Sequence, residues 1–118
     1  HRHALAMSQE EILIGGDGIF RAAGAKISQA LRTARVPAVF PWPHFHEYRV
    51  LMSYGPDLRN VASRAAYYVD KILRGAKPSD LPVEQVSQVD LIIDLRVARE
   101  LGIKVPQELL FRAARVIR

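Results

Sequence analysis

The sequence predicts a three-layer α/β/α domain with a mostly parallel sheet, and three observations lead to this prediction. Short apolar runs of strand length alternate with longer runs whose apolar residues recur every three or four positions, as on an amphipathic helix. The strand-like runs end in glycine, proline or small polar residues, where a chain can turn. With 118 residues the chain can bury one ordinary core, so we expect one domain over residues 1–118.

The first two strands and the first helix are predicted in the N-terminal third of the chain. The apolar run at 12–14 predicts a short buried strand, closed by "GGDG". The apolar period then changes to three and four, which predicts a helix from Ile19 to about Arg35. "VPAVFPWP" predicts a second strand at 38–40, which ends there because proline cannot continue a central ladder. The following "HFHEY" is expected to form a helical turn or a loop.

The middle of the chain predicts a strand followed by a long helix. "RVLMSY" is the third strand, at 49–54. Asp57 can cap the N-terminus of the helix, whose apolar residues fall in one stripe, and Gly75 follows its last turn at Arg74. "GAKPSDLP" contains two prolines and is expected to be an extended linker.

The C-terminal third predicts one more strand and two helices. "VDLIID" is the fourth strand, at 89–94, and Asp94 can cap the helix that follows it. Gly102 is expected to end that helix. Pro106 occupies a first-turn position and predicts a terminal helix through "PQELLFRAARVIR".

The composition excludes several classes of protein. Hydrophobic residues at 49% and charged residues at 25% are typical of a folded protein. No apolar run is as long as a membrane span, and "HRHALAMSQEE" lacks the apolar core of an export signal. The chain has no cysteine, which rules out disulfides and thiolate sites. Its net charge of +5 comes from Lys and Arg gathered near helix ends, so we expect no nucleic-acid partner.

Candidate ligand residues lie in the loops that follow strands, because ligands of open parallel sheets bind at the carboxyl ends of the strands. "GGDG" is neither the dinucleotide fingerprint nor a P-loop, since it lacks GxGxxG spacing and a Lys-Ser/Thr pair. Two alternatives remain for Asp17. It either starts a helix after a tight turn or holds an amino or hydroxyl group of a ligand.

The loop after the second strand carries two histidines and two aromatic residues. His44, His46 and Glu47 could bind zinc, but residues two apart share a face only in a strand. Because Pro41 and Pro43 disfavour a strand here, we favour exposed loop histidines and predict no metal. Trp42 and Phe45 either form an apolar wall for a ligand or pack under the loop.

The sequence contains no pattern that asks for catalysis or for a cofactor. There is no G-x-S-x-G elbow, and Ser53 has no evident base partner. Nothing in the sequence therefore asks for bond-breaking chemistry, so we predict that the chain is not an enzyme and holds no cofactor.

The most specific segments of the chain are "LMSYGPDLRNVASRAAYYVDKILRGAKPSDLPVEQ" and "VDLIIDLRVARELGIKVPQELLFRAARVI". They resemble a known family, the substrate-binding proteins of ABC transporters with the type I periplasmic-binding-protein fold, and "ILIGGDGIF", "RVPAVFPW" and "HFHEYRVLMSYG" are similar to the segments just upstream. The resemblance covers about residues 4–117. Members of this family have two α/β lobes, and the chain matches only the second, so the resemblance implies that the N-terminal lobe and the export signal are absent.

The resemblance implies capture of a small solute, such as an amino acid, and its delivery to an ABC permease. The parent protein is then expected in the periplasm or anchored outside the membrane. By position, Asp17 and Gly18 match the first ligand-facing loop and Glu47 the second. Ser53, Tyr54 and Gly55 match the third, although a plain strand-to-helix turn remains the alternative.

Absence of the first lobe has a consequence for the long helix. Its apolar stripe between Asp57 and Arg74 would be exposed and would favour a homodimer. The alternative function is therefore a stand-alone α/β interaction module that dimerises and binds no solute.

Overall fold

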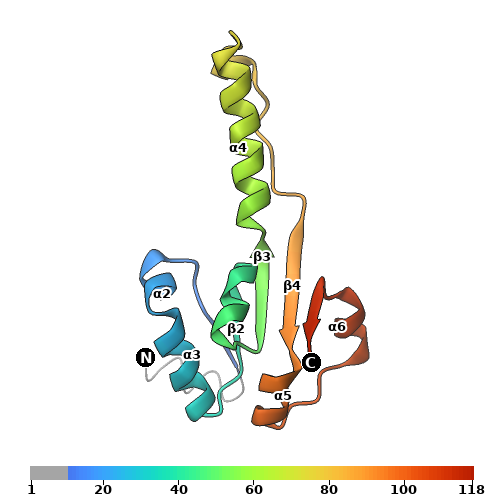
Figure 1. Ribbon diagram of the computed structural model, residues 1–118. Coiled ribbons are helices and arrows are strands. Elements are labelled where there is room, and N and C mark those ends of the chain that lie inside the picture. The colour runs from blue at the N-terminus through green and yellow to red at the C-terminus, as the bar shows by residue number, and fades with distance from the viewer. Residues whose placement is uncertain (1–10) are drawn as a thin grey trace.

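The computed structural model describes residues 11–118 and contains a five-stranded sheet in the order β1-β2-β3-β4-β5 (Figure 1). The strands are β1 (Ile12–Leu13), β2 (Ala38–Pro41), β3 (Met52–Pro56), β4 (Val89–Asp94) and β5 (Arg115–Ile117). The pairs β1–β2, β2–β3 and β4–β5 are parallel, and β3–β4 is antiparallel. This mostly parallel sheet with its helices confirms the predicted fold class.

The helices follow the predicted order, with one interruption. They are α2 (Gly18–Ala22), α3 (Gly24–Thr33), α4 (Leu58–Leu73), α5 (Leu95–Leu101) and α6 (Gln107–Arg112), together with the 3₁₀ helices η1 (Pro43–Tyr48) and η2 (Pro78–Asp80). The single helix expected from Ile19 to Arg35 is broken at Ala23, where α2 ends. Gly24 then packs against η1 so closely that an added Cβ would lie 2.8 Å from Tyr48 Cε2. Close packing on η1 therefore decides the path of the chain at this point.

The predicted terminal helix is wrong in its second half. Helix α6 ends at Arg112, and β5 pairs in parallel with β4, placing Val116 opposite Ile93. The Ala114 N–H donates to the Leu91 carbonyl at 2.8 Å, which starts this pairing. Strand formation wins here because the sheet edge satisfies the backbone groups and the β-branched Val116 packs well on a sheet.

Two apolar clusters form the core. One contains Leu51, Ile93, Val97, Ala98 and Val105, and it joins β3 and β4 to α5. The other contains Ala38, Phe40, Phe45 and Val50, and it holds η1 against β2. Helix α5 is fixed to the first cluster by its N-cap Asp94, whose Oδ1 accepts from the Arg96 N–H at 2.9 Å.

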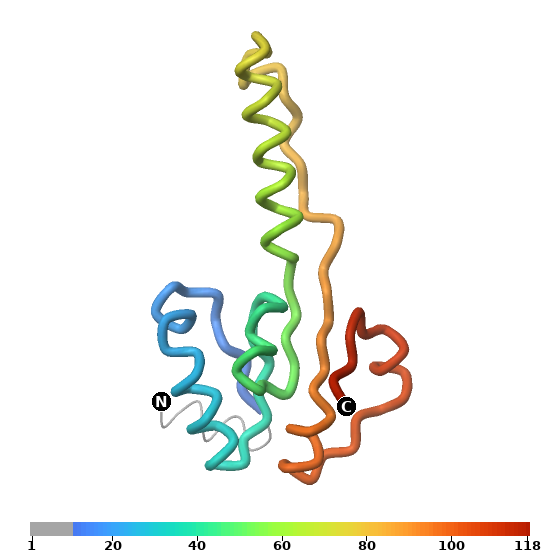
Figure 2. The backbone as a smooth tube through the Cα atoms, viewed as in Figure 1, coloured from blue at the N-terminus to red at the C-terminus, as the bar shows by residue number. Residues whose placement is uncertain are grey.

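Helix α4 lies outside this core. It continues from the end of β3 and rises away from the sheet, and the returning segment runs beside it before entering β4 (Figures 1 and 2). No residue of α4 is buried. The radius of gyration is 17.6 Å, whereas about 13.5 Å is expected for a compact chain of this length. The predicted ends of α4 are confirmed, because Asp57 Oδ1 accepts from the Arg59 N–H and Gly75 has a φ of 105°.

Two expectations concern membranes and export. Among residues 11–118, none of the helices has both the length and the apolar character that a membrane span requires. Most of the segment "HRHALAMSQEE", in which we expected no export signal, lies outside the described residues.

Candidate functional site

The candidate site lies at the carboxyl edge of β1, β2 and β3, which are parallel and therefore end side by side. Asp17 follows β1 and caps α2, with its Oδ1 accepting from the Ile19 N–H at 2.8 Å. Gly18 begins the helix, and an added Cβ there would meet nothing within 4 Å. Asp17 and Gly18 are both exposed, so Asp17 acts as a cap while its carboxylate still reaches solvent.

Trp42, which follows β2, has a strained backbone. Its φ of 64° lies in the left-handed region, where a bulky residue costs roughly 1–3 kcal/mol. Gly55 makes room for it, because an added Cβ there would lie 2.6 Å from the Trp42 backbone nitrogen. A Cβ on Gly16 would lie 3.5 Å from Trp42 Cζ2, at ordinary contact distance. The loops after β1 and β2 and the end of β3 therefore meet at this tryptophan.

The indole of Trp42 belongs to a group of near-parallel rings. The ring centroids are 5.8 Å apart for Trp42 and His44, 4.8 Å for His44 and Phe45, and 6.1 Å for Trp42 and Phe45. Phe45 is 0% exposed and also contacts the rings of Phe40 and Tyr48. Of the two alternatives for Phe45, the structure places it under the loop, where it supports Trp42 from the core.

The two histidines of this loop are not exposed as expected, because both are partly buried, and their surroundings differ. Nε2 of His44 is buried and has no hydrogen-bond partner. Burial lowers the pKa of His44, and the nearby Arg21 lowers it further, while Glu47 opposes the shift. His46 turns elsewhere, with its Nδ1 2.7 Å from the Pro43 carbonyl oxygen. Within residues 11–118, no three His, Asp or Glu side chains are grouped so that they could hold a metal.

The predicted residues at the end of β3 point in different directions. Ser53 is 0% exposed, and its hydroxyl donates to the Pro43 carbonyl at 3.3 Å, which ties the loop to the strand. Because side chains alternate along a strand, Tyr54 points to the opposite face from Ser53, and it is 57% exposed. Glu47 is exposed on η1. The structure thus brings Gly16, which precedes Asp17, and Gly55 against Trp42, while Tyr54 points to the other face of the sheet from Ser53.

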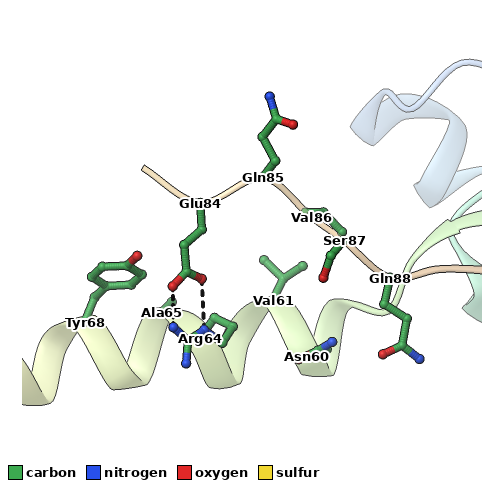
Figure 3. Close-up of a pocket in the computed structure, with 10 residues that line it drawn as sticks. All are labelled: Asn60, Val61, Arg64, Ala65, Tyr68, Glu84, Gln85, Val86, Ser87 and Gln88. Carbon is green, nitrogen blue, oxygen red and sulfur yellow. Dashed lines mark hydrogen bonds and ion pairs between the residues drawn. The ribbon is translucent and has the colours of Figure 1, made fainter. Parts of the chain in front are cut away.

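A second concave region lies between the start of α4 and the returning segment, with a volume of about 320 Å³ (Figure 3). Arg64 forms a two-pronged ion pair with Glu84, in which Nε and Oε2 are 2.9 Å apart. Its guanidinium lies 4.4 Å from the centre of the Tyr67 ring. The hydrogen bond from Arg64 lowers the pKa of Glu84. The Tyr68 hydroxyl donates to the Pro82 carbonyl at 2.7 Å.

Sequence reasoning missed two features of these regions. We expected an extended linker after α4 and did not foresee that Glu84 would return to Arg64, 20 residues earlier. We also did not foresee the stacking of His44 on Trp42. The opposite charges of Arg64 and Glu84 were a weak signal for their ion pair. The ring stacking had no such signal, because it depends on how the loop folds.

Comparisons with known proteins bear on the family and the fold of the chain. The family model for ABC transporter substrate-binding proteins matches residues 4–117. A conserved domain protein from Vibrio cholerae is 28% identical, with a TM-score of 0.82 over 96% of this chain. An ABC domain from Streptococcus pneumoniae, solved in complex with L-Trp, is 24% identical, with a TM-score of 0.83 over 98% of this chain.

A third solved structure is less similar. The ligand-free, open form of a substrate-binding protein with adhesive properties from Clostridium difficile is 19% identical, with a TM-score of 0.61 over 90% of this chain. The chain spans 38%, 41% and 36% of the lengths of these three structures. No curated protein matches the chain.

Proposed function

Since the chain belongs to the family of ABC transporter substrate-binding proteins, we propose that it forms one half of a cleft that captures a small solute for a membrane permease. The observation that carries this proposal is the meeting of three strand ends at Trp42, whose strained φ of 64° is accommodated by Gly55. Backbone strain of this kind clusters at functional sites. The function is binding, and no bond is made or broken.

The solute contacts in this proposal come from the exposed residues of the edge. One oxygen of Asp17 caps α2, and the other is available to an amino or hydroxyl group of the solute. Gly18 leaves room for the solute to approach, and Trp42 supplies an apolar wall. Glu47 lies at the rim.

The remaining predicted residues have supporting or peripheral roles in the proposal. Phe45 and Ser53 hold the loop from inside, and Gly55 lets the Trp42 backbone pass. Tyr54 faces the other side of the sheet, so its side chain contacts the solute only if it extends past the edge of the strand.

The second half of the cleft belongs to another lobe, which we place against α4. The exposed apolar side chains of α4 support this, and they include Leu58, Val61, Val69, Ile72 and Leu73. A 16-residue helix without a buried residue gains little from packing, and isolated helices of this length are marginal in water. The share of about two fifths that the chain covers in its solved neighbours also supports a second lobe.

The solute is an amino acid in this proposal, and the aromatic ones are the first to test, because a neighbour of the same fold was solved with L-Trp. Residues 1–118 then form one lobe of a protein that works outside the cytoplasmic membrane beside its permease. Closure of the two lobes is driven by the higher affinity of the closed form for the solute.

An NMR titration of the ¹⁵N-labelled chain with L-tryptophan and other amino acids tests the proposal. A half cleft makes half of the contacts at the same association cost, so we expect weak but saturable binding. Amide shifts should concentrate in residues 15–18 and 42–47 and disappear in Asp17→Ala. Saturable shifts confined to another surface would mean that the site is elsewhere, and no shifts with any amino acid would count against solute binding.

The exposed stripe of α4 favours one alternative function, a module that dimerises and binds no solute. Its mass in solution would then be twice the chain mass of 13.3 kDa, and Ile72→Asp would return it to a monomer. A monomer at all accessible concentrations would remove this alternative.

A further inference from the structure

Trp42 is the only tryptophan in the chain, and its indole stacks on the rings of His44 and Phe45. Gly55 leaves room for the strained Trp42 backbone, and a Cβ on Gly16 would touch the indole at 3.5 Å from Cζ2. The His44 ring lies within 16° of parallel to the indole. Because Phe45 cannot be protonated, His44 is the stacked side chain whose protonation can decide where the indole points.

The burial of His44 Nε2 suits a neutral imidazole, whereas stacking alone would also accept an imidazolium over the indole face. A neutral ring has one nitrogen without a proton, and the buried Nε2 of His44, which has no partner, can be that nitrogen. Protonation would add an N–H there that finds no acceptor in the described part of the chain, and a buried donor without an acceptor is costly. A protonated His44 must therefore leave its place against Trp42 to reach water.

Charges from several elements face or surround this ring. Arg21 on α2 and His46 disfavour its protonation, while Glu47 favours it. The other charged or titratable groups on the elements packed against η1 are Lys26 and Arg32 on α3, Tyr54 on β3, and Asp90 and Asp94 on β4. Of these, Arg32 donates to the Tyr48 carbonyl, and Asp94 is paired with Arg96.

We propose that His44 is a positioning residue for Trp42, and that its protonation releases the indole from the cleft edge and weakens solute binding. The second part rests on the proposed function, whereas the first does not. An ordinary histidine titrates near pH 6.5. Because burial lowers the pKa of His44, release of the indole is expected only below that pH.

The emission of Trp42 tests the first part in the full chain without any solute. On acidification we expect the quenching of this emission by acrylamide to rise, with a midpoint below about pH 6.5, because a released indole meets solvent. His44→Phe keeps an aromatic ring and should abolish the transition. His46→Gln is the matched control and should behave as the unaltered chain, because its ring bonds to the Pro43 carbonyl instead.

Circular dichroism of the same samples separates repositioning from unfolding. We expect constant helical signal across the transition. Persistence of the transition in His44→Phe, its loss in His46→Gln, or a simultaneous loss of helical signal would overturn the assignment.

The second part is tested by the L-tryptophan titration about one pH unit above and one below the midpoint found from Trp42 emission. We expect severalfold weaker binding at the lower pH, and equal binding in His44→Phe at both. Equal affinities in the unaltered chain would overturn the link to solute binding. Absence of binding at both pH values would count against the proposed function and this link together, whereas the emission experiment would still decide the role of His44.

Discussion

The sheet body, residues 11–56 and 89–118, and the α4 hairpin, residues 57–88, are stabilised by different interactions. In the body, Phe40, Phe45, Ile93 and Val97 are almost completely buried. In the hairpin, α4 contains no buried residue. Its order comes from local groups, namely the Asp57 cap, the Arg64–Glu84 ion pair and the hydrogen bond from Tyr68 to Pro82. The body is therefore held together by buried contacts, whereas the hairpin depends on local interactions.

This difference divides the expected effects of substitutions. Changes in the body should alter the free energy of unfolding, because they remove buried contacts. Changes on the hairpin should leave that free energy nearly unchanged and act on association, because the side chains there meet solvent.

The largest effect is expected for Phe45→Ala. Its ring is 0% exposed and contacts four other rings, so truncation should cost about 3–5 kcal/mol of unfolding free energy. Urea unfolding measures this loss. The control is Leu73→Ala on α4, where 82% of the residue is exposed, and a change within about 0.5 kcal/mol is expected. Similar losses for both variants would break the distinction between body and hairpin.

The next effect is expected for Gly55→Ala at the junction between β3 and α4. The added Cβ would lie 2.6 Å from the backbone nitrogen of Trp42, and a backbone atom cannot move aside as a side chain tip can. We expect a loss of about 1–3 kcal/mol in urea unfolding, together with a shift in Trp42 emission. Gly18→Ala is the control, since nothing lies within 4 Å of its added Cβ. An unchanged stability in Gly55→Ala would show that the junction can adjust.

The two aspartate caps compare body and hairpin directly. Asp94 in the body is 1% exposed, and Asp94→Ala should lower the free energy of unfolding by about 0.5–2 kcal/mol. Asp57→Ala should instead destabilise only the first turn of α4, which amide exchange would detect as faster exchange in that turn. A global loss in Asp57→Ala as large as that in Asp94→Ala would mean that α4 folds as part of the body.

Acid should act on the same Asp94 cap. Burial alone would raise the pKa of Asp94, but the hydrogen bonds from Arg96 outweigh it and lower that pKa. The unfolded carboxyl titrates near pH 3.9, so this stabilisation is complete above about pH 4 and is lost as pH falls through the lower folded value. The stability of Asp94→Asn should therefore change less with acid than that of the unaltered chain. Equal acid dependence of the two would contradict this assignment.

Local features of the sequence predicted much of the fold. The caps at Asp57 and Asp94 and the C-terminal glycines at Gly75 and Gly102 depend on neighbouring residues alone, and the structure confirms them. Strand β5 was missed because it depends on pairing with β4, some 23 residues earlier along the chain by the register of Ile92 with Arg115. Helical spacing in "RAARVI" could not reveal that partner.

The candidate site was less accessible to sequence reasoning, for the same reason. Loop position identified Asp17 and Trp42, but it could not show that Phe45 lies inside or that His44 stacks on Trp42. Strand alternation could have separated Tyr54 from Ser53 in advance. Contacts between loops depend on how the sheet assembles, and the residue types alone do not encode them.

The smallest effect on stability is expected for Arg64→Ala, and it gives the most local test of the hairpin. Its ion pair with Glu84 is exposed, so urea unfolding should not change measurably. The pair nevertheless holds segment 83–88 to α4, so amide exchange in that segment should become faster. High salt should reproduce part of this effect in the unaltered chain by screening the pair. Arg74→Ala removes an ion pair with Asp70 inside one helix and should leave the exchange of 83–88 unchanged. If Arg64→Ala left that exchange unchanged as well, the returning segment would be held by Tyr68 and Pro82, and the hairpin would not depend on its charges.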